Sequence, residues 1–151
     1  MTYNVISTGS QGNAVVINNV ILIDCGVSFK ALSAIYKDLK LVLLTHCHFD
    51  HFKKSTIKKL SSERPMLRFA CCDWLVNDLV ECGVEKKNID VLEIGKIHNY
   101  KIFKVIPVKL YHNVLNCGYK IHFESEKLFY ATDTGTLDGI SAKDYDLYMV
   151  D

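Results

Sequence analysis

The stretch Thr45-His46-Cys47-His48-Phe49-Asp50-His51 follows an apolar run and carries the strongest chemical signal in the sequence. At the end of a strand, His46 and His48 would point the same way because they are two residues apart, while Asp50 and His51 reach a second ion from the next turn. Imidazole and carboxylate ligands suit zinc, iron or manganese better than a thiolate-selective metal. The alternative is a solvated polar loop, but neighbouring histidines at a strand end are difficult to satisfy without a metal. We therefore interpret this stretch as a metal site.

The length and composition are those of a globular domain. The chain has 151 residues, of which 49% are hydrophobic and 23% charged, and this is enough to bury a core. No segment approaches the roughly 18 uninterrupted apolar residues of a membrane span, and residues 1–6 lack the features of a secretory signal. We expect one domain over residues 1–151, no membrane contact and a cytoplasmic location.

The six cysteines do not follow the spacing of a disulfide framework or a thiolate zinc site. None forms a CxxC pair, and the expected compartment is reducing. Cys47 lies between His46 and His48, and alternation along a strand turns it away from the face that those two share. We expect most of the cysteines to be buried free thiols and Cys47 not to be a metal ligand.

Basic residues are concentrated directly after the histidine cluster. The net charge of +1 predicts no general attraction to nucleic acid, so any attraction must be local. Between residues 53 and 68 the single acid is Glu63. Both a solvated helix face and a phosphate-binding surface remain open as interpretations. The basic residues are Lys53, Lys54, Lys58, Lys59, Arg64 and Arg68.

The hydrophobic pattern predicts many short strands and a few helices. Strands are expected at 3–7, 14–17, 20–23, 41–44, 67–70, 89–94, 100–110, 117–123, 127–131 and 146–150. Helices are expected at 28–37, 55–61 and 73–82, with Ser28 and Asp73 as N-caps and Gly83 after the last of them. The Asn18-Asn19 pair predicts a hairpin turn, and the strands from residue 89 onward are expected to form a second sheet.

Three further polar residues stand where strands are expected to end. His112 would supply a third nitrogen beside His46 and His48. Asp133 could bridge two ions, and Asp24 could orient a ligand imidazole without binding metal itself. Taken alone, an aspartate at a strand end is more often a turn former, so this alternative stays open for both.

Taken together, these motifs resemble those of the metallo-β-lactamase superfamily. The resemblance is carried by His46-x-His48-x-Asp50-His51, by Ile23-Asp24-Cys25-Gly26 before it, and by His112 and Thr132-Asp133-Thr134-Gly135 after it. The resemblance implies an α+β fold, the αββα sandwich of two sheets between helices.

Two N-terminal stretches narrow the resemblance further. Residues 7–13 (Ser-Thr-Gly-Ser-Gln-Gly-Asn) and 22–30 (Leu-Ile-Asp-Cys-Gly-Val-Ser-Phe-Lys) are similar to the YycJ/WalJ-type branch of the superfamily, which also occurs in phage genomes. That branch is associated with DNA exonuclease-like activity.

The resemblance implies a centre of two divalent metal ions, zinc in the first instance, with manganese or iron as alternatives. Such paired cations lower the pKa of a bound water toward neutrality. Asp50 would hold this attacking water and act as the catalytic residue. The implied ligands are His46, His48 and His112 for one ion and Asp50 and His51 for the other, with Asp133 bridging the two.

The chain departs from the superfamily pattern near its C-terminal end. Members usually supply a further histidine to the second metal from a later segment, and no histidine follows His122 here. The fold also normally continues past a point equivalent to residues 145–151. We expect a truncated version of the fold, and the alternative is a short form with a weakened second site. His98 and His122 are expected at the surface and not among the ligands.

The expected function is a metal-dependent phosphodiesterase that acts on DNA like an exonuclease. Nucleic acid would be the partner, with its backbone against Lys53, Lys54, Lys58 and Lys59. One alternative is a thioester or lactone hydrolase of the same fold. Another is a non-catalytic module that binds metal or nucleic acid and has an incomplete second metal site.

Overall fold

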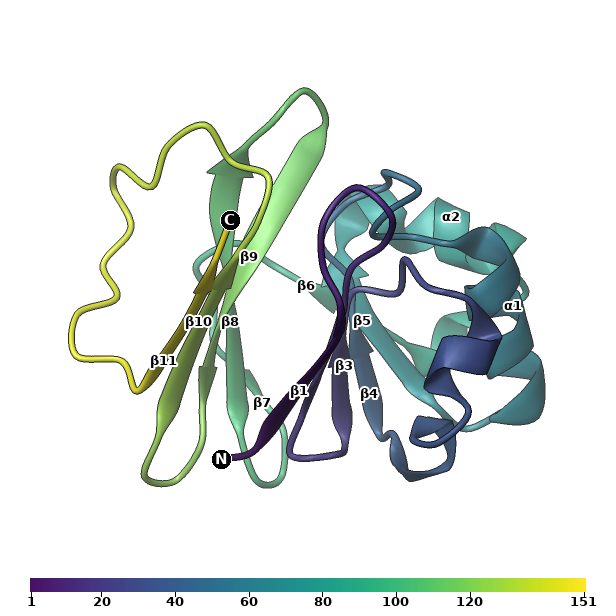
Figure 1. The fold of residues 1–151 in the computed structure, drawn as a ribbon. Helices are drawn as coiled ribbons and strands as arrows, with labels where there is room; N and C mark the ends of the chain where they lie inside the picture. Colours follow the sequence, from purple (N-terminus) through teal and green to yellow (C-terminus); the bar gives the residue numbers. More distant parts are fainter. The chain divides into compact units, whose positions relative to one another are not determined.

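The computed structural model describes residues 1–151 as two compact units, Met1–Val91 and Leu92–Asp151. Each unit is built on one β-sheet, and the helices belong to the first unit (Figure 1). This mixed composition confirms the predicted α+β class. No helix reaches the length and apolar character that crossing a membrane would need.

The first unit contains a six-stranded sheet in the order β1-β2-β3-β4-β5-β6. Its first three strands form an antiparallel meander, and Asn18 and Asn19 make the predicted hairpin turn with φ values of 50° and 59°. β3, β4 and β5 then run parallel to one another. The strands are β1 (Tyr3–Ser7), β2 (Ala14–Ile17), β3 (Ile21–Ile23), β4 (Leu41–Leu43), β5 (Arg68–Cys72) and β6 (Ile89–Leu92).

The helices of the first unit are short. α1 covers the expected helix and extends it at both ends, whereas 73–82 divides into a 3-10 turn and α2, and Asp73 lies inside that turn, with Cys72 as the N-cap. Gly83 follows α2 with a φ of 89°, as predicted. The helical segments are η1 (Phe29–Leu32), η2 (Tyr36–Asp38), α1 (Lys54–Glu63), η3 (Asp73–Leu75), α2 (Val76–Glu81) and η4 (Lys86–Asn88).

The helix expected over 28–37 is wrong, because the segment forms the two separate 3-10 turns η1 and η2. Ser28 does cap the first turn, since its hydroxyl accepts a hydrogen bond from the Ala31 N–H at 3.3 Å. Only Leu32 is fully buried in η1, and no residue is fully buried in η2. A continuous helix here would have little apolar face to bury, and most helical stability in proteins comes from such burial.

The parallel arrangement of β3 and β4 places two polar segments at one edge of the first sheet. Asp24 directly follows β3, and Leu44, Thr45 and His46 follow β4. Because parallel strands end at the same edge, these segments are neighbours, and the Asp24 N–H donates to the Leu43 carbonyl at 2.8 Å. The apolar side chains of β3 and β4 are completely buried, which anchors both segments.

Gly26 allows the chain after β3 to approach the histidine motif closely. The Cys25 N–H donates to the His51 carbonyl at 2.9 Å, and the Lys53 N–H donates to the Cys25 carbonyl at 2.7 Å. A Cβ atom on Gly26 would lie 1.8 Å from the backbone oxygen of Asp50. Only glycine fits this position, so residues 23–26 and the histidine motif are held together through the backbone.

The second unit contains a five-stranded sheet in the order β11-β10-β9-β8-β7 and no helix. β10 and β11 are parallel, and the other neighbours are antiparallel. Strand predictions at 117–123, 127–131 and 146–150 are confirmed within about two residues. The strands are β7 (His98–Asn99), β8 (Lys104–Tyr111), β9 (Leu115–His122), β10 (Lys127–Ala131) and β11 (Leu147–Val150).

Two details of the second sheet differ from the prediction. β6 was expected in this sheet, but it belongs to the first one. The strand expected from residue 100 begins at Lys104, because the Tyr100 N–H bonds the Phe103 carbonyl at 2.9 Å and closes a turn. This turn connects β8 to β7, so His98 lies in a short strand and not in a turn.

We predict that Gly26→Ala destabilises the protein by about 3 kcal/mol or more. The added methyl group overlaps the backbone of Asp50, and backbone atoms cannot avoid a clash by changing rotamer as a side chain can. Thermal and urea unfolding would measure the change. Gly135→Ala is the matched control, since its Cβ would meet no atom closer than 3.9 Å. Equal stability of the two variants would contradict the required close approach.

Candidate metal centre

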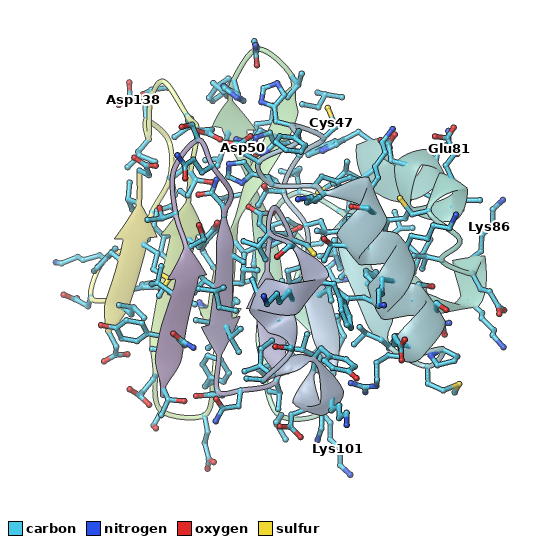
Figure 2. The ribbon with its side chains drawn as sticks, turned by 45° about the vertical axis from the view of Figure 1, so that its right-hand side comes forward. Cys47, Asp50, Glu81, Lys86, Lys101 and Asp138 are labelled. Atoms are coloured by element: carbon cyan, nitrogen blue, oxygen red, sulfur yellow. The ribbon has the colours of Figure 1, made fainter.

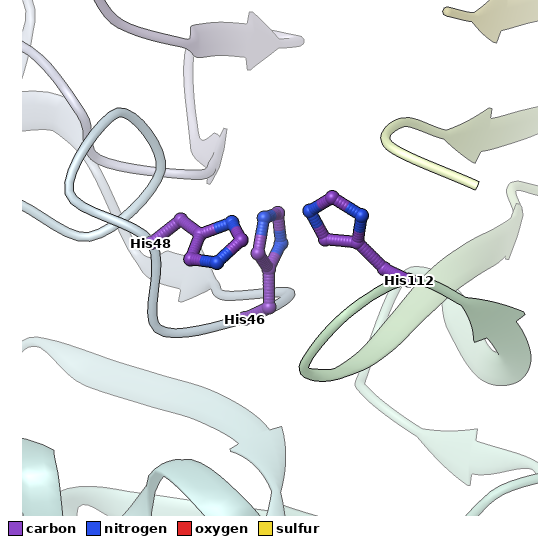
Figure 3. Close-up of side chains that lie close together, drawn as sticks. All are labelled: His46, His48 and His112. Carbon is purple, nitrogen blue, oxygen red and sulfur yellow. The ribbon is translucent and has the colours of Figure 1, made fainter. Parts of the chain in front are cut away.

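The loop after β4 gathers three imidazole rings of the first unit. His46 and His51 are buried and His48 is half-buried. The His46 ring centroid lies 5.0 Å from that of His48 and 4.2 Å from that of His51. A ring nitrogen of His46 lies within 4.8 Å of a ring nitrogen of His48, and the same holds for His46 and His51. Figure 3 shows His46 and His48 with their rings turned toward each other.

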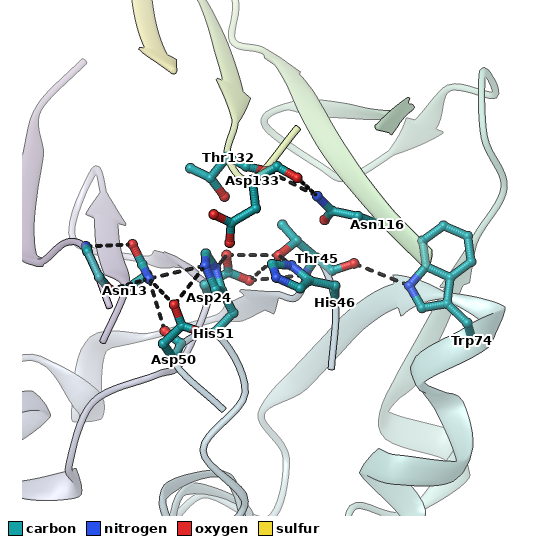
Figure 4. Close-up of polar contacts among 11 residues, drawn as sticks. Asn13, Asp24, Thr45, His46, Asp50, His51, Trp74, Asn116, Thr132 and Asp133 are labelled. Atoms are coloured by element: carbon teal, nitrogen blue, oxygen red, sulfur yellow. Dashed lines mark hydrogen bonds and ion pairs between the residues drawn. The ribbon is translucent and has the colours of Figure 1, made fainter. Parts of the chain in front are cut away.

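Asp24 organises this loop through its buried carboxylate. The Thr45 N–H donates to Asp24 Oδ1 at 3.0 Å, and the Thr45 hydroxyl lies 2.9 Å from both carboxylate oxygens. His51 Nδ1 lies 2.6 Å from Asp24 Oδ2 (Figure 4). Asp24 therefore orients an imidazole of the motif, which is the role that the sequence predicts for it.

These contacts assign the tautomers of two histidines. Because a carboxylate can only accept, His51 carries its proton on Nδ1 and leaves the Nε2 lone pair for a ligand. The Thr45 hydroxyl donates to Asp24, so His46 Nδ1, at 2.8 Å from Thr45 Oγ1, must be the donor there. His46 Nε2 is then also a lone-pair nitrogen. One carboxylate thus prepares two imidazoles for metal binding.

Asn13 positions Asp50, and it was not among the site residues predicted from the sequence. The Asn13 N–H donates to the Asp50 carbonyl at 2.7 Å, and the side-chain amide donates to the same oxygen at 3.1 Å. The amide nitrogen also lies 3.1 Å from His51 Nε2, a contact that a metal ion at His51 would replace. The available signal was the branch-like stretch 7–13 that ends in this asparagine.

Two of the aspartates singled out from the sequence have a left-handed backbone. Asp24 has a φ of 62° and Asp133 a φ of 55°. Aspartate tolerates this region better than most residues, which agrees with their interpretation as turn formers. Such conformations cost free energy and concentrate where a side chain must be aimed. For Asp24 the turn and the functional contact are therefore the same feature.

In the second unit, the structure brings the loops that carry His112 and Asp133 to one end of the sheet. His112 follows β8 and Asp133 follows β10. The Gly135 N–H donates to the Tyr111 carbonyl at 2.9 Å, and the Tyr111 N–H donates to Thr134 Oγ1 at 3.0 Å. These two bonds hold the loops side by side.

Asn116 supports the Asp133 loop and was not singled out from the sequence. Its buried side-chain amide donates to the carbonyls of Thr132 at 3.0 Å and Asp133 at 3.1 Å (Figure 4). These bonds hold the backbone that presents the Asp133 carboxylate. An asparagine directly before the apolar strand predicted at 117–123 was the signal that could have indicated a buried hydrogen-bonding role.

All six cysteines are free thiols, as predicted for most of them, and five of them are buried. Burial raises the pKa of the Cys25 thiol and raises the pKa of the Cys71 thiol to about 12. Cys47 is the exposed one (Figure 2). That Cys47 is not a metal ligand stays a prediction.

The residues of the first unit fit a divalent metal ion by their chemistry. Three imidazoles and the half-exposed Asp50 carboxylate occupy one loop, and the two buried rings have the tautomer that binding needs. Nitrogen and carboxylate donors suit zinc, manganese and iron. A buried cluster of imidazoles with such an orienting carboxylate is the arrangement expected of metal-ligating histidines.

We predict that Asp24→Asn lowers zinc affinity by about 10–100-fold, because the amide cannot hold both Thr45 and the His51 Nδ1–H. The same change should cost about 1–3 kcal/mol of stability without metal. Competition with a chromogenic chelator and thermal unfolding measure the two effects. Asp38→Asn, at an exposed position of the same unit, is the control. An Asp24→Asn protein that folds and binds zinc normally would disprove the orienting role.

Thiol chemistry provides a separate check. We expect Ellman's reagent to modify Cys47 rapidly in the native protein and the five buried cysteines only after unfolding, because the reactive species is the thiolate and burial disfavours it. Cys47→Ser should remove the rapid phase and leave zinc affinity within about twofold, as expected for a side chain that is not a ligand. A tenfold or larger loss of affinity would instead make Cys47 a ligand.

Comparison with known proteins supports the resemblance seen in the motifs. A protein-family model described as the β-lactamase superfamily domain matches residues 19–151. The exodeoxyribonuclease YycJ of Bacillus anthracis is 24% identical over 144 residues, which cover 88% of this chain and 54% of that protein. The chain therefore spans about half the length of this relative.

Solved structures share the fold at low sequence identity. The metallo-β-lactamase fold protein YhfI from Bacillus subtilis is 16% identical, with a TM-score of 0.69 over 86% of this chain and 63% of that one. The short form of human tRNase Z (ELAC1) is also 16% identical, with a TM-score of 0.66 over 93% of this chain and 71% of that one. The chain thus has the metallo-β-lactamase fold, and by the match over residues 19–151 it belongs to the β-lactamase superfamily domain family.

Proposed function

We propose that this protein is a metal-dependent hydrolase that cleaves phosphodiester bonds in nucleic acid, in the manner of a DNA exonuclease. The observation that carries the proposal is the set of imidazoles on the loop after β4, two of which are prepared as ligands by Asp24. Such a set needs no nucleophilic side chain, because water is the attacking group in metallohydrolases.

The proposed ligand set is the one that the family resemblance implies. His46, His48 and His112 would hold one ion. Asp50 and His51 would hold the other, with Asp133 bridging. The motif spacing and the family support this assignment, and so do the positions of His46, His112 and Asp133 within three residues of a strand end.

Asp50 is the proposed catalytic residue. Asn13 holds the Asp50 backbone by a hydrogen bond. The Asp50 side chain is 27% exposed, so the carboxylate can contact a water molecule from solvent. The bound ions would make water more acidic and neutralise charge on the scissile phosphoryl group. Asp50 would orient the attacking water and accept its proton.

The names of two similar proteins support nucleic acid as the substrate. One is an exodeoxyribonuclease and the other a tRNase, although each is less than 25% identical to this chain. The shared fold by itself supports hydrolysis of several substrate classes. The choice of a phosphodiester therefore needs support from the surface of this chain.

The surface beside the histidine loop offers such support. Lys54, Lys58 and Lys59 are exposed on α1. Phe49, inside the motif, is 68% exposed, and the Lys53 ammonium lies 5.9 Å from its ring centroid. An exposed aromatic ring next to cations suits a nucleobase and its phosphate.

Two arginines of the basic run have structural roles. Arg64 donates to the carbonyls of Tyr36 at 2.7 Å and Lys37 at 2.9 Å. Arg68 forms an ion pair with Asp90. The proposed contact surface is therefore limited to the four lysines, Lys53, Lys54, Lys58 and Lys59, together with Phe49.

We predict that the metal-loaded protein releases nucleotides from end-labelled DNA, and that His48→Ala lowers the rate at least about 100-fold, because a direct ligand should matter more than the outer residues that support it. Single- and double-stranded substrates should be compared by gel electrophoresis. Lys58→Glu should raise KM and leave kcat nearly unchanged, while Lys86→Glu, on the exposed turn η4, should change neither.

Metal counting separates the outcomes. Two ions per chain together with nuclease activity would support the proposal. Bound metal without release above the His48→Ala level would reject it and favour a binding module or a thioester or lactone hydrolase. Absence of bound metal after loading would remove the basis of all these activities.

A further inference from the structure

The second unit contains a cavity of about 640 Å³ that uses none of the residues assigned to the metal centre. It lies where the turn between β7 and β8 meets the turn between β9 and β10. Both turns stand at the same end of the second sheet in Figure 1, and Lys104 in β8 pairs with His122 in β9 at this end. The volume is in the range of small-molecule sites.

Aromatic side chains form one part of the cavity wall. Tyr100 and Phe103 are stacked, with ring centroids 5.0 Å apart and planes at 20°. Phe103 also contacts Phe123, at 5.9 Å and 48°. Phe103 is almost completely buried, whereas Tyr100 and Phe123 remain partly exposed. The cavity therefore presents ring surface that a planar ligand can cover.

Positively charged side chains form the other part of the cavity wall. Three lysines, Lys101, Lys104 and Lys127, line the cavity against one carboxylate, Glu124. All three lysines are exposed, and Figure 2 shows Lys101 extending from the ribbon. Burial, together with the charges of Lys127, Lys120 and Lys104, lowers the pKa of His122, which also lines the cavity. A ligand with a negative charge would relieve this concentration of cations.

His122 has a fixed orientation in the wall. Its Nε2 is hydrogen-bonded to the Tyr145 hydroxyl, and the two rings are in edge contact at 5.4 Å. His122 is therefore partly buried and held in place, whereas the sequence predicts a surface residue. This hydrogen bond shapes the cavity next to the lysines.

The cavity is distant from the second unit's candidate metal ligands. β8 begins at Lys104, beside the cavity, and ends at Tyr111, directly before His112. At about 3.3 Å per residue, the cavity and His112 are about 25 Å apart along this strand. A nucleotide held in the cavity is therefore too far from His112 to react there.

We propose that this cavity is a nucleotide-binding site, in which the base packs on the exposed aromatic rings and the phosphate lies among the lysines. Stacking on aromatic side chains and contact with cations are the two interactions by which proteins bind nucleotides without reading their sequence. The proposal goes beyond hydrolysis, since it requires neither metal nor activity. The nucleotide can be free or the end of a nucleic-acid strand.

The test is calorimetric titration of the full chain carrying His48→Ala, in the presence of a chelator, so that the metal centre cannot capture phosphate. The probes are AMP, adenosine, inorganic phosphate and a 5′-phosphorylated oligodeoxyadenylate. AMP should bind at least about tenfold more tightly than adenosine or phosphate, because both parts of the cavity contribute. Comparison of AMP with the oligonucleotide distinguishes a free nucleotide from a strand end.

Three substitutions in the same background localise the binding. Lys101→Glu should weaken AMP binding at least about tenfold, whereas Lys143→Glu, an exposed lysine of the same unit outside the cavity, should not. Phe123→Leu should reduce AMP affinity to that of phosphate and leave phosphate affinity unchanged. Circular dichroism checks folding.

The proposal is overturned if AMP binds no better than its fragments, or if folded Lys101→Glu and Lys143→Glu proteins bind it equally. If the metal-loaded protein without any substitution shows no nuclease activity but nucleotide binding is observed, only the proposed hydrolysis is rejected.

Discussion

The buried carboxylate of Asp24 is the interaction on which the candidate site of the first unit depends. A carboxylate removed from water is costly unless its lone pairs are satisfied. Here the Thr45 backbone and hydroxyl and the His51 ring satisfy them. The same bonds connect the end of β3 to the loop after β4 and determine which nitrogens of two histidines can accept. A single requirement for hydrogen bonding thus serves both folding and ligand preparation.

Backbone geometry makes this network possible. β3 and β4 are parallel, so the residues after both strands emerge at one edge. Gly26 then lets the chain pass against the Asp50 backbone, where a side chain has no space, and Asn13 adds a hydrogen bond to the same carbonyl from the turn before β2. Two segments distant from Asp50 in sequence, those of Asn13 and Gly26, therefore converge on its backbone.

The second sheet has two chemically different ends. At one end, loops after β8 and β10 are joined by hydrogen bonds and present His112 and Asp133. At the other end, aromatic rings and lysines surround a cavity. Strands with buried apolar centres separate the two, so each end can vary without disturbing the other. Such a separation allows a binding surface to be added to a hydrolase fold.

The sequence by itself determined the fold class, most of the strands and the residue types of the candidate site. Alternating and apolar runs encode strands locally, and the spacing of His46, His48, Asp50 and His51 encodes ligand chemistry within one loop. Local pattern could not establish that residues 28–37 form two turns, that β6 joins the first sheet, or that Asn13 and Asn116 brace aspartate loops. Those features depend on which surfaces and hydrogen-bonding groups meet after folding, and contacts between distant residues leave no periodic trace in the chain. For the same reason, only the tertiary structure decided the tautomers of His46 and His51, through the carboxylate of Asp24.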